Sequence, residues 1–488
     1  MAVEYDLVVI GGGSGGLVVA GVAAALKAKV ALVEKDRLGG DCLWYGCVPS
    51  KSLIYASRLA YEVKNAGKFG IHCNEAHIDF AKAIAHVQNV ISNIEPHDSP
   101  ERFEGLGCEV IFGDGEFIDR QTFKINGRSI KARAFVISTG SRPAIPSVSG
   151  LEEAGYITNE EVFSITQRPE TLAIIGGGPI GCELGQAFSR LGSEVTIVAG
   201  SDRILPKEDP EAAQVVAEQF TLEGIQVLTN TRVDKVEVIN GKKVLWAKEQ
   251  KIAEVDQILI AAGRQPNVES LNLKAAGVEM QQKRESGYGN SDKGKKGIRV
   301  NAKLQTTNPR IYACGDVIGG YQFTHVASYE ANIVLRNALF LPVIKADYKV
   351  IPWATFTDPE LARVGLSEQE AKERYGNDIQ IVKQEYADVD RAQAEAATVG
   401  FAKIITRRNG QILGAHLVGA AAGELIHEIV LAMSHNLKIS ALGGIHIYPT
   451  LAEVNSKAAF ALTQQNYEKS YRLQKLLTKV FQLLRALG

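Results

Sequence analysis

The sequence has few of the features that mark secreted or membrane-spanning proteins. Six cysteines in 488 residues are too few and too scattered for the disulfide framework of a small secreted domain. Glycine and charged residues interrupt the apolar runs well before they reach the length of a membrane span. The N-terminus lacks a basic segment and a small-residue cleavage site, so no signal peptide is expected. These absences predict a cytoplasmic protein.

An excess of charge of either sign is also missing. The formal net charge is −1, which gives no reason to expect bulk binding to nucleic acid. Hydrophobic residues make up 45% of the chain and charged residues 22%, as in soluble globular enzymes. The length is enough for about two to four domains.

Two glycine-rich fingerprints follow short apolar segments that are expected to form buried parallel strands. In the first, a strand over residues 5–10 leads into the glycines, a helix to about Lys27, and a second strand that closes at Glu34. The glycines would let backbone amides approach a pyrophosphate, and Glu34 would accept a hydrogen bond from a ribose hydroxyl. The second fingerprint repeats this order, with strands at 172–175 and 194–198. Two fingerprints predict two bound dinucleotides.

Cys42 and Cys47 lie five positions apart, directly after the first nucleotide-binding unit. One helical turn plus a residue brings the two sulfurs close enough for a disulfide if the helix begins irregularly. Gly46 relieves crowding between them, and Pro49 fixes the backbone beyond the second sulfur. A disulfide in such a short, strained loop is of the labile, catalytic kind. The alternative is a pair of buried cysteines with no shared role.

The motif Cys-x4-Cys-Val-Pro-Ser-Lys after a dinucleotide fingerprint resembles the flavin-dependent pyridine nucleotide-disulfide oxidoreductases, a family that includes mercuric reductase. The family also includes dihydrolipoamide dehydrogenase and glutathione reductase, and the resemblance covers about residues 4–465. It implies an α/β fold with two Rossmann-like dinucleotide-binding domains, for FAD and NAD(P), and a C-terminal α+β dimerisation domain. The implied ranges are 1–147 and 268–345 for the FAD domain, 148–267 for the NAD(P) domain, 346–466 for the dimerisation domain, and 467–488 for a basic amphipathic helix.

Segments further along the chain also match the family, and the resemblance carries site residues with them. The flavin motifs lie at 134–140, 258–266 and 311–316, and the dimerisation domain begins with the signature at 356–365. The residues implied to hold FAD are Gly11, Gly13, Ser14, Gly16, Glu34, Lys35, Gly40, Asp41, Lys51, Thr139, Gly140, Gly263 and Asp316. Those implied to hold NAD(P)H are Gly176, Gly178, Gly181, Ser201 and Arg203.

The strand at 194–198 ends at Ala199, where NAD-preferring members carry an acidic residue that holds the ribose hydroxyls. Without a carboxylate there is no repulsion against a 2′-phosphate, and Ser201 or Arg203 is a candidate contact for that phosphate. We therefore expect NADPH as the reductant. NADH remains the alternative, because an arginine at this point also occurs where NAD is used.

The resemblance also implies the catalytic roles. NAD(P)H reduces the flavin, which reduces a Cys42–Cys47 disulfide, with Cys47 nearer the ring and Cys42 as the exchange thiol. Lys51 is implied to pair with Glu183 and to stabilise the reduced ring. No metal-binding domain and no cysteine after Cys314 are present, so the metal relay of mercuric reductase is missing. The active site is implied to be completed by the partner subunit of an obligate homodimer.

The sequence departs from the family at its acid–base residue. Thiol-exchanging members carry His-Pro-Thr-x-x-Glu, whereas Tyr448 stands here in the histidine position and Glu453 is retained. A tyrosine at this position resembles mercuric reductase and the soluble transhydrogenases. Transhydrogenases tend to lose the second cysteine, whereas Cys47 is present, so the resemblance is closest to the mercuric reductase-like branch. Tyrosine has a pKa of about 10 and histidine of about 6.5, so exchange is expected to slow by about 10²–10⁴-fold. His446 lies two positions earlier, about 6.6 Å away along an expected extended strand, and is expected to be packed rather than to replace the base.

Residues 467–488 form a further segment with an apolar stripe and no acidic residue after Glu468. The stripe has helical spacing and consists of Leu473, Leu476, Leu477, Val480, Leu484 and Leu487. Its basic residues are Lys469, Arg472, Lys475, Lys479 and Arg485. Such a helix either packs on its own dimer or lies on an anionic membrane surface.

Three functional hypotheses follow. The first is an NAD(P)H-dependent flavoprotein reductase with a redox-active disulfide, acting on a metal ion, a quinone or another small acceptor. The second is dihydrolipoamide dehydrogenase, which Tyr448 disfavours. The third is a membrane-docked flavoprotein interaction subunit in which turnover is incidental.

Overall fold

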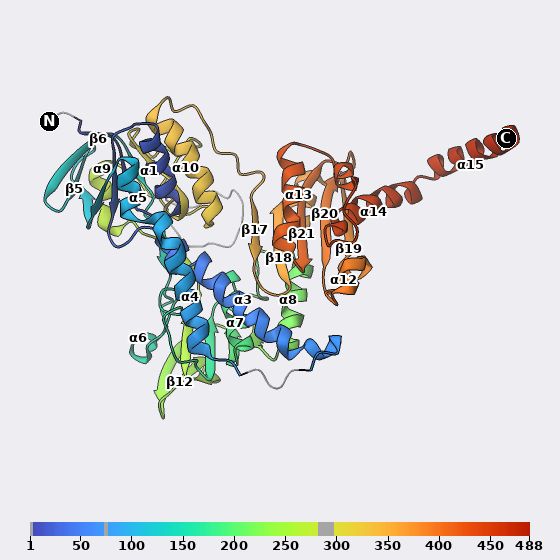
Figure 1. Ribbon diagram of the computed structural model, residues 1–488, viewed down its shortest axis with the longest axis horizontal. Coiled ribbons are helices and arrows are strands. Elements are labelled where there is room, and N and C mark those ends of the chain that lie inside the picture. The colour runs from blue at the N-terminus through green and yellow to red at the C-terminus, as the bar shows by residue number, and fades with distance from the viewer. Residues whose placement is uncertain (1–2, 73–76, 282–296) are drawn as a thin grey trace. The chain divides into compact units, whose positions relative to one another are not determined.

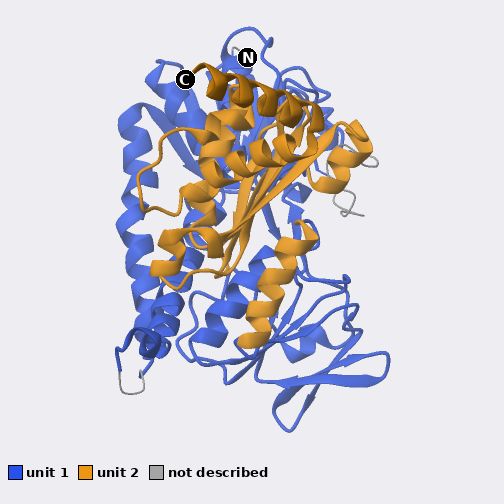
Figure 2. Cartoon of the chain, turned by 90° about the vertical axis from the view of Figure 1, so that its right-hand side faces the viewer, with its two compact units in different colours: residues 1–207, 223–347 blue, residues 208–222, 348–488 orange. Residues whose placement is uncertain are grey.

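The computed structural model describes residues 3–72, 77–281 and 297–488. The chain divides into two compact units (Figure 2). Unit 1 comprises Met1–Lys207 and Glu223–Asp347, and unit 2 comprises Glu208–Leu222 and Tyr348–Gly488. Each unit is described by itself.

The larger sheet of unit 1 has largely apolar, buried strands at its centre. Its order is β3-β2-β1-β6-β5-β4, and β16 also pairs with β6. Strands β1, β2, β3, β6 and β16 pair in parallel, while β4 and β5 join as an antiparallel hairpin. Because β1 is central, five of its six residues are fully or almost fully buried. The bounds are β1 Tyr5–Ile10, β2 Val30–Glu34, β3 Cys108–Phe112, β4 Gly115–Phe117, β5 Thr122–Ile125, β6 Arg128–Ile137 and β16 Ile311–Ala313.

A second parallel sheet of unit 1 has the order β10-β9-β8-β14. Two small antiparallel sheets accompany it, one of three strands (β11-β12-β13) and one of two (β15-β7). The bounds are β7 Ser141–Pro143, β8 Thr171–Ile175, β9 Glu194–Val198, β10 Gln226–Leu228, β11 Lys235–Ile239, β12 Lys242–Ala247, β13 Gln250–Val255, β14 Gln257–Ile260 and β15 Arg264–Pro266.

Helices cover these sheets and connect their strands (Figure 1). Helix α1 packs against α10, and α3 packs against α4 and α7. The bounds are α1 Ser14–Ala25, α2 Gly40–Trp44, α3 Cys47–Lys64, α4 Phe80–Ile94, α5 Pro100–Leu106, α6 Leu151–Ala154, α7 Pro179–Arg190, α9 Leu273–Ala276 and α10 Thr324–Leu339.

Unit 2 contains a five-stranded antiparallel sheet in the order β17-β18-β21-β20-β19. Helices α13 and α14 pack against it, and its central strand β21 is buried throughout. The strands are β17 Pro352–Thr355, β18 Glu360–Gly365, β19 Ile379–Glu385, β20 Phe401–Arg407 and β21 Ile412–Gly419. The helices are α8 Pro210–Leu222, α11 Glu368–Tyr375, α12 Asp390–Ala394, α13 Ala422–Ser434, α14 Glu453–Lys469 and α15 Tyr471–Leu487.

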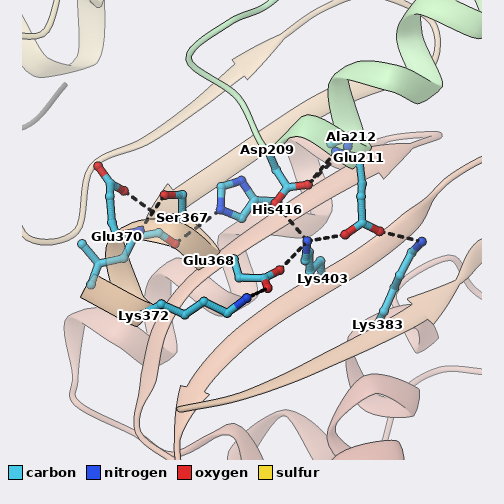
Figure 3. Close-up of polar contacts among 11 residues, drawn as sticks. Asp209, Glu211, Ala212, Ser367, Glu368, Glu370, Lys372, Lys383, Lys403 and His416 are labelled. Carbon is cyan, nitrogen blue, oxygen red and sulfur yellow. Dashed lines mark hydrogen bonds and ion pairs between the residues drawn. The ribbon is translucent and has the colours of Figure 1, made fainter. Parts of the chain in front are cut away.

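A buried lysine ties α8 to this sheet (Figure 3). Lys403 Nζ, on β20, lies 3.1 Å from Asp209, 2.6 Å from Glu211 and 2.9 Å from Glu368. Burial alone would lower the pKa of Lys403, but hydrogen bonds to the three carboxylates outweigh it and raise that pKa. The cation therefore stays charged, and its removal would leave the buried Asp209 without its counter-ion, whereas Glu211 keeps Lys383 and Glu368 keeps Lys372.

The predicted α/β fold class is confirmed, and both fingerprints form the expected strand–turn–helix–strand units. The predicted tail helix begins later than expected, at Tyr471, because α14 continues through residue 469 and Ser470 separates the two helices. The assignment of residues 148–267 to one NAD(P)-binding domain stays a prediction. In the division into two units, residues 208–222 group with unit 2. Among the described residues, no helix combines the length and the apolar character that crossing a membrane requires.

Candidate active site

The first glycine-rich turn joins β1 to α1 and leaves no room for side chains. Gly11 has a φ of +103°, and a Cβ there would lie 2.5 Å from the Ser138 carbonyl oxygen. A Cβ at Gly16 would lie 1.9 Å from the oxygen of Gly11. Glu34, at the end of β2, accepts a hydrogen bond from the Gly12 amide at 2.7 Å. The turn and the carboxylate are therefore held together at the carboxyl edge of the sheet.

The second turn, between β8 and α7, repeats this construction. Gly176 has a φ of +130°, and a Cβ at Gly181 would lie 2.0 Å from its oxygen. Where the first turn has Glu34 beside Gly12, the second has Ala199 beside Gly177, with 2.8 Å between the Ala199 Cβ and a Cβ built on Gly177. The second turn therefore has the same backbone geometry without the acidic group.

Two arginines lie close to the end of β9. Ser201 donates a hydrogen bond to the Arg203 carbonyl oxygen at 2.7 Å, and the Arg203 guanidinium donates to Pro206 O at 3.1 Å. Arg232 was not among the predicted residues. It lies beside Gly200, because a Cβ built on Gly200 would be 3.2 Å from the Arg232 Cγ. Arg232 follows β10 and lies 51 residues after Gly181, the last glycine of the fingerprint, so no local motif singles it out.

The two cysteines lie on consecutive helices, the short α2 and the longer α3. Cys42 is in α2, Cys47 is the first residue of α3, and both thiols are free. Gly46 separates the helices, and a Cβ there would lie 2.8 Å from the Asp41 carbonyl oxygen. Cys47 Sγ lies 3.3 Å from the hydroxyl of Thr324, the first residue of α10. The pair is thus set against the N-terminus of a helix, which favours a negative charge.

The surroundings of the two thiols shift their pKa values in opposite directions. A hydrogen bond from Cys42 lowers the pKa of Cys47 to about 6, with Thr324 and the charge of Lys51 adding to the effect against the cost of burial. The same bond raises the pKa of Cys42, as do burial and the charge on Cys47. Near neutrality the reduced pair therefore carries one thiolate, on Cys47.

Lys51 lies one turn beyond Cys47 on α3. Its Nζ is 2.9 Å from Oε2 of Glu183, a buried residue of α7, so the pairing that the resemblance implied is present. The Asp41 carboxylate has two partners. Its Oδ1 lies 2.9 Å from Arg264 Nη2 and 3.2 Å from Asn159 Nδ2. These bonds fix the charged groups around the cysteine pair.

The segment after β6 forms a second polar cluster in unit 1. Asp316 accepts a hydrogen bond from Ser141 Oγ at 2.5 Å, and Arg264 Nε donates to the same hydroxyl at 2.8 Å. Thr139 and Asn267 exchange hydrogen bonds, at 2.6 Å from the Thr139 hydroxyl and 3.0 Å from the Asn267 amide. Gly140 and Gly263 have positive φ values of 65° and 118°, and their carbonyl oxygens accept from the amides of Asn267 and Ala144 at 3.0 Å and 2.9 Å, which joins the two turns.

Tyr448 lies in unit 2, where its hydroxyl donates to Asp390 Oδ2 at 2.8 Å. This hydrogen bond raises the pKa of Tyr448, so its phenol stays protonated near neutrality. His446 is bound on both ring nitrogens, by Glu428 at 3.0 Å and Gly444 O at 2.9 Å. Residues 444–450 are irregular, so the expected extended strand is wrong. Glu453 begins α14 and accepts from the Thr450 amide at 3.4 Å.

Comparison with known proteins decides the family. The sequence model described as pyridine nucleotide-disulphide oxidoreductase matches residues 5–331, and that of the family's dimerisation domain matches residues 351–459. The chain belongs to this family. It is therefore an enzyme that uses FAD and NAD(P)H, and its dimerisation domain supports a homodimer.

The relatives include two kinds of enzyme at similar distance. A mercuric reductase of Staphylococcus aureus is 37% identical over 92% of this chain and 81% of its own length. A dihydrolipoyl dehydrogenase of Chlamydia muridarum is 34% identical over 93% of this chain and 96% of its own. Among solved structures, the Cu(II) complex of the HOCl-induced flavoprotein disulfide reductase RclA from Escherichia coli has a TM-score of 0.82 and 28% identity, covering 94% of this chain and all of that one.

The residues of both turns fit the cofactors of this family. A Cβ on Gly40 would lie 2.7 Å from the Gly13 Cα, so two chain segments meet where FAD would be held and neither accepts a side chain. Helix α1 starts at Ser14 without a side-chain cap, and this suits a diphosphate at its first amides. At the second turn a Cβ on Gly178 would meet nothing within 4 Å, which leaves the helix start open to a dinucleotide.

Replacement of Cys42 by alanine is expected to raise the pKa of Cys47 from about 6 toward the ordinary thiol value of about 8.5. The thiolate exists above the pKa and is lost as pH falls through it, so the variant should lose thiolate between these two pH values. The measurement is the pH dependence of iodoacetamide labelling at Cys47 in the reduced enzyme, located by peptide mass mapping. The matched control is Cys42→Ser, which keeps a donor and should shift less. An unchanged titration in Cys42→Ala would contradict this assignment.

Proposed function

We propose that the chain is an FAD-dependent NADPH oxidoreductase in which the Cys42–Cys47 pair delivers electrons to a small, thiophilic acceptor, foremost a metal ion. Bound FAD supplies hydride transfer from the nicotinamide. The observation that carries the proposal is Tyr448, which stands where thiol-exchanging members have histidine and is hydrogen-bonded to Asp390.

The cysteine pair performs the chemistry that this chain itself contributes. Reduction of the disulfide by two electrons and one proton leaves a Cys42 thiol and a Cys47 thiolate, in keeping with their divided pKa values. Lys51, 2.9 Å from Glu183, supplies positive charge one turn from Cys47. Two sulfurs on adjacent helices offer soft ligands to a thiophilic ion such as Hg(II) or Cu(I).

Tyr448 argues against a bulky disulfide as the acceptor. Thiol–disulfide exchange needs a group that takes up and returns a proton near neutrality, and a phenol with a raised pKa does neither. His446 is held by Glu428 and Gly444 and is not free to replace it. Reduction of a metal ion takes up no proton and needs no such relay at the exchange thiol. In the homodimer we assign Tyr448 and Glu453 of the partner subunit to the same site, as in the family.

Some relatives support a metal acceptor and others support lipoamide. The S. aureus relative is named a mercuric reductase, and the E. coli structure is a Cu(II) complex, which agrees with a metal acceptor. The C. muridarum relative is a dihydrolipoyl dehydrogenase, so lipoamide is the competing substrate. Quinones are the further candidate among small acceptors.

The test is anaerobic reduction by NADPH followed by rapid mixing with single acceptors. Hg(II), Cu(II), a soluble quinone, lipoamide and glutathione disulfide are compared at equal concentration. The proposal predicts reoxidation by at least one metal ion or the quinone within a turnover time, and slow reoxidation by both disulfides. Lipoamide as the fastest acceptor would assign the enzyme to the dihydrolipoyl dehydrogenases instead.

The nucleotide preference is predicted to depend on Ala199. Ala199→Glu should lower the ratio of kcat/KM for NADPH to that for NADH by about 10²-fold, because a carboxylate at the end of β9 repels a 2′-phosphate and holds the ribose hydroxyls. The size-matched control is Ala199→Gln, which adds no charge and should change the ratio far less. Arg203→Gln and Arg232→Gln should lower kcat/KM for NADPH alone. A native enzyme that prefers NADH would contradict the prediction.

A further inference from the structure

Helix α15 separates its apolar and basic residues onto opposite faces. The apolar face adds Phe481 and Leu483 to the six predicted residues, so eight of its seventeen residues lie on one side, nearly half of the circumference. The polar face carries Arg472, Lys475, Lys479 and Arg485, and the helix contains no acidic residue.

The start of α15 is fixed by hydrogen bonds. Ser470 caps it by accepting from the Leu473 amide at 3.4 Å. Gln474 donates back to the last carbonyls of α14, at 3.1 Å to Tyr467 O and 2.8 Å to Glu468 O. These contacts satisfy backbone groups at both sides of the break, so α15 is a defined helix.

The apolar face of α15 is exposed. None of its seventeen side chains is buried, and Leu483 and Leu487 remain 61% and 77% exposed. In Figure 1, α15 runs on from α14 away from the sheet of the same unit. A contiguous apolar face of this kind marks an interaction surface.

We propose that α15 docks the enzyme onto an anionic lipid bilayer. The whole chain has a formal net charge of −1, so four basic and no acidic side chains within seventeen residues are a local concentration of positive charge. An amphipathic helix with a wide apolar face and basic flanks lies in the plane of the membrane. The apolar side chains enter the acyl boundary and the cations meet the headgroups.

A second copy of α15 is a poorer partner. Leu473, Leu476, Val480, Leu483 and Leu487 have the 3-4 spacing of a coiled-coil seam, but they span only about two heptads. Arg472 and Lys479 would flank that seam, and no acidic residue of a facing copy would pair with them. Leu477, Phe481 and Leu484 would also stay outside it. Charge and the width of the apolar face therefore both favour lipid.

The test is co-sedimentation of the purified full-length holoenzyme with lipid vesicles. Binding is expected to vesicles of mixed phosphatidylglycerol and phosphatidylcholine, and to be roughly 10²-fold weaker or absent with phosphatidylcholine alone. The double variant Lys475→Gln/Lys479→Gln should weaken binding about 25-fold, about fivefold for each charge removed. High salt should also weaken binding, because it screens the exposed charges. Leu476→Gln/Leu483→Gln should weaken it about tenfold or more.

Control variants separate lipid binding from a role in assembly. Lys124→Gln/Lys274→Gln removes the same charge from exposed sites in unit 1 and should leave vesicle binding unchanged. All variants should keep NADPH-dependent acceptor turnover and the oligomeric state of the parent, measured by light scattering. Absence of binding to anionic vesicles would overturn the proposal. So would a change of oligomeric state in Leu476→Gln/Leu483→Gln, because the face would then be covered by a second copy.

Discussion

Replacement of either Cys42 or Cys47 by serine is expected to lower acceptor turnover by on the order of 10³-fold or more. Serine keeps the size of the side chain but replaces a thiolate with a hydroxyl that stays protonated and is a poor ligand for soft metals. The Cys47 thiolate, with a pKa of about 6, and the Cys42 thiol would no longer form a two-electron couple. The measurement is steady-state NADPH consumption with Hg(II) or with the fastest acceptor found.

Cys108→Ser is the matched control for this prediction. Cys108 is a buried core residue whose thiol faces the Ala20 carbonyl oxygen at 3.6 Å, and a serine hydroxyl can donate to the same oxygen. Its turnover should stay near that of the parent. Either active-site variant retaining more than about a tenth of the parent turnover, with FAD still bound, would show that the electrons bypass the cysteine pair.

Tyr448→His is expected to raise lipoamide turnover by about 10²-fold, at the low end of what general acid–base catalysis contributes. The introduced imidazole would replace a phenol whose pKa is raised by Asp390 with a group that titrates near neutrality. Glu453, which orients the histidine in the family, is already present at the start of α14. The measurement is kcat for lipoamide in parent and variant.

Two further variants, Tyr448→Phe and His446→Ala, test whether Tyr448 or His446 acts as the acid–base group. Neither adds a base, so neither should raise lipoamide turnover, and Tyr448→Phe tests the phenol hydroxyl by itself. If the parent already reduces lipoamide as fast as Tyr448→His does, the tyrosine is not the barrier to exchange. A large loss in His446→Ala would instead identify His446 as the base despite its bonds to Glu428 and Gly444.

Sequence reasoning identified the features that depend on local geometry. Gly11, Gly16, Gly176 and Gly181 stand where only glycine fits, because a Cβ would meet backbone oxygen at 2.5 Å or less. Strands β1 and β8 follow from short apolar runs that only a buried parallel strand accommodates.

The missed features depend on contacts between distant segments. Thr324 lies 277 positions from Cys47 and contacts its sulfur, and Asp390 lies 58 positions from Tyr448 and accepts a hydrogen bond from its hydroxyl. No spacing rule places such pairs together, because folding alone brings them into contact. The strand expected around His446 does not form: residues 444–450 are irregular, and no neighbouring strand pairs with them among the described residues.

The most direct test of the account is the number of electrons that the native enzyme accepts from NADPH without oxygen. The account predicts four electrons per subunit, two of them on the cysteine pair, with two new thiols detected at Cys42 and Cys47 by labelling and peptide mapping. Uptake of two electrons with no new thiol at either position would contradict it.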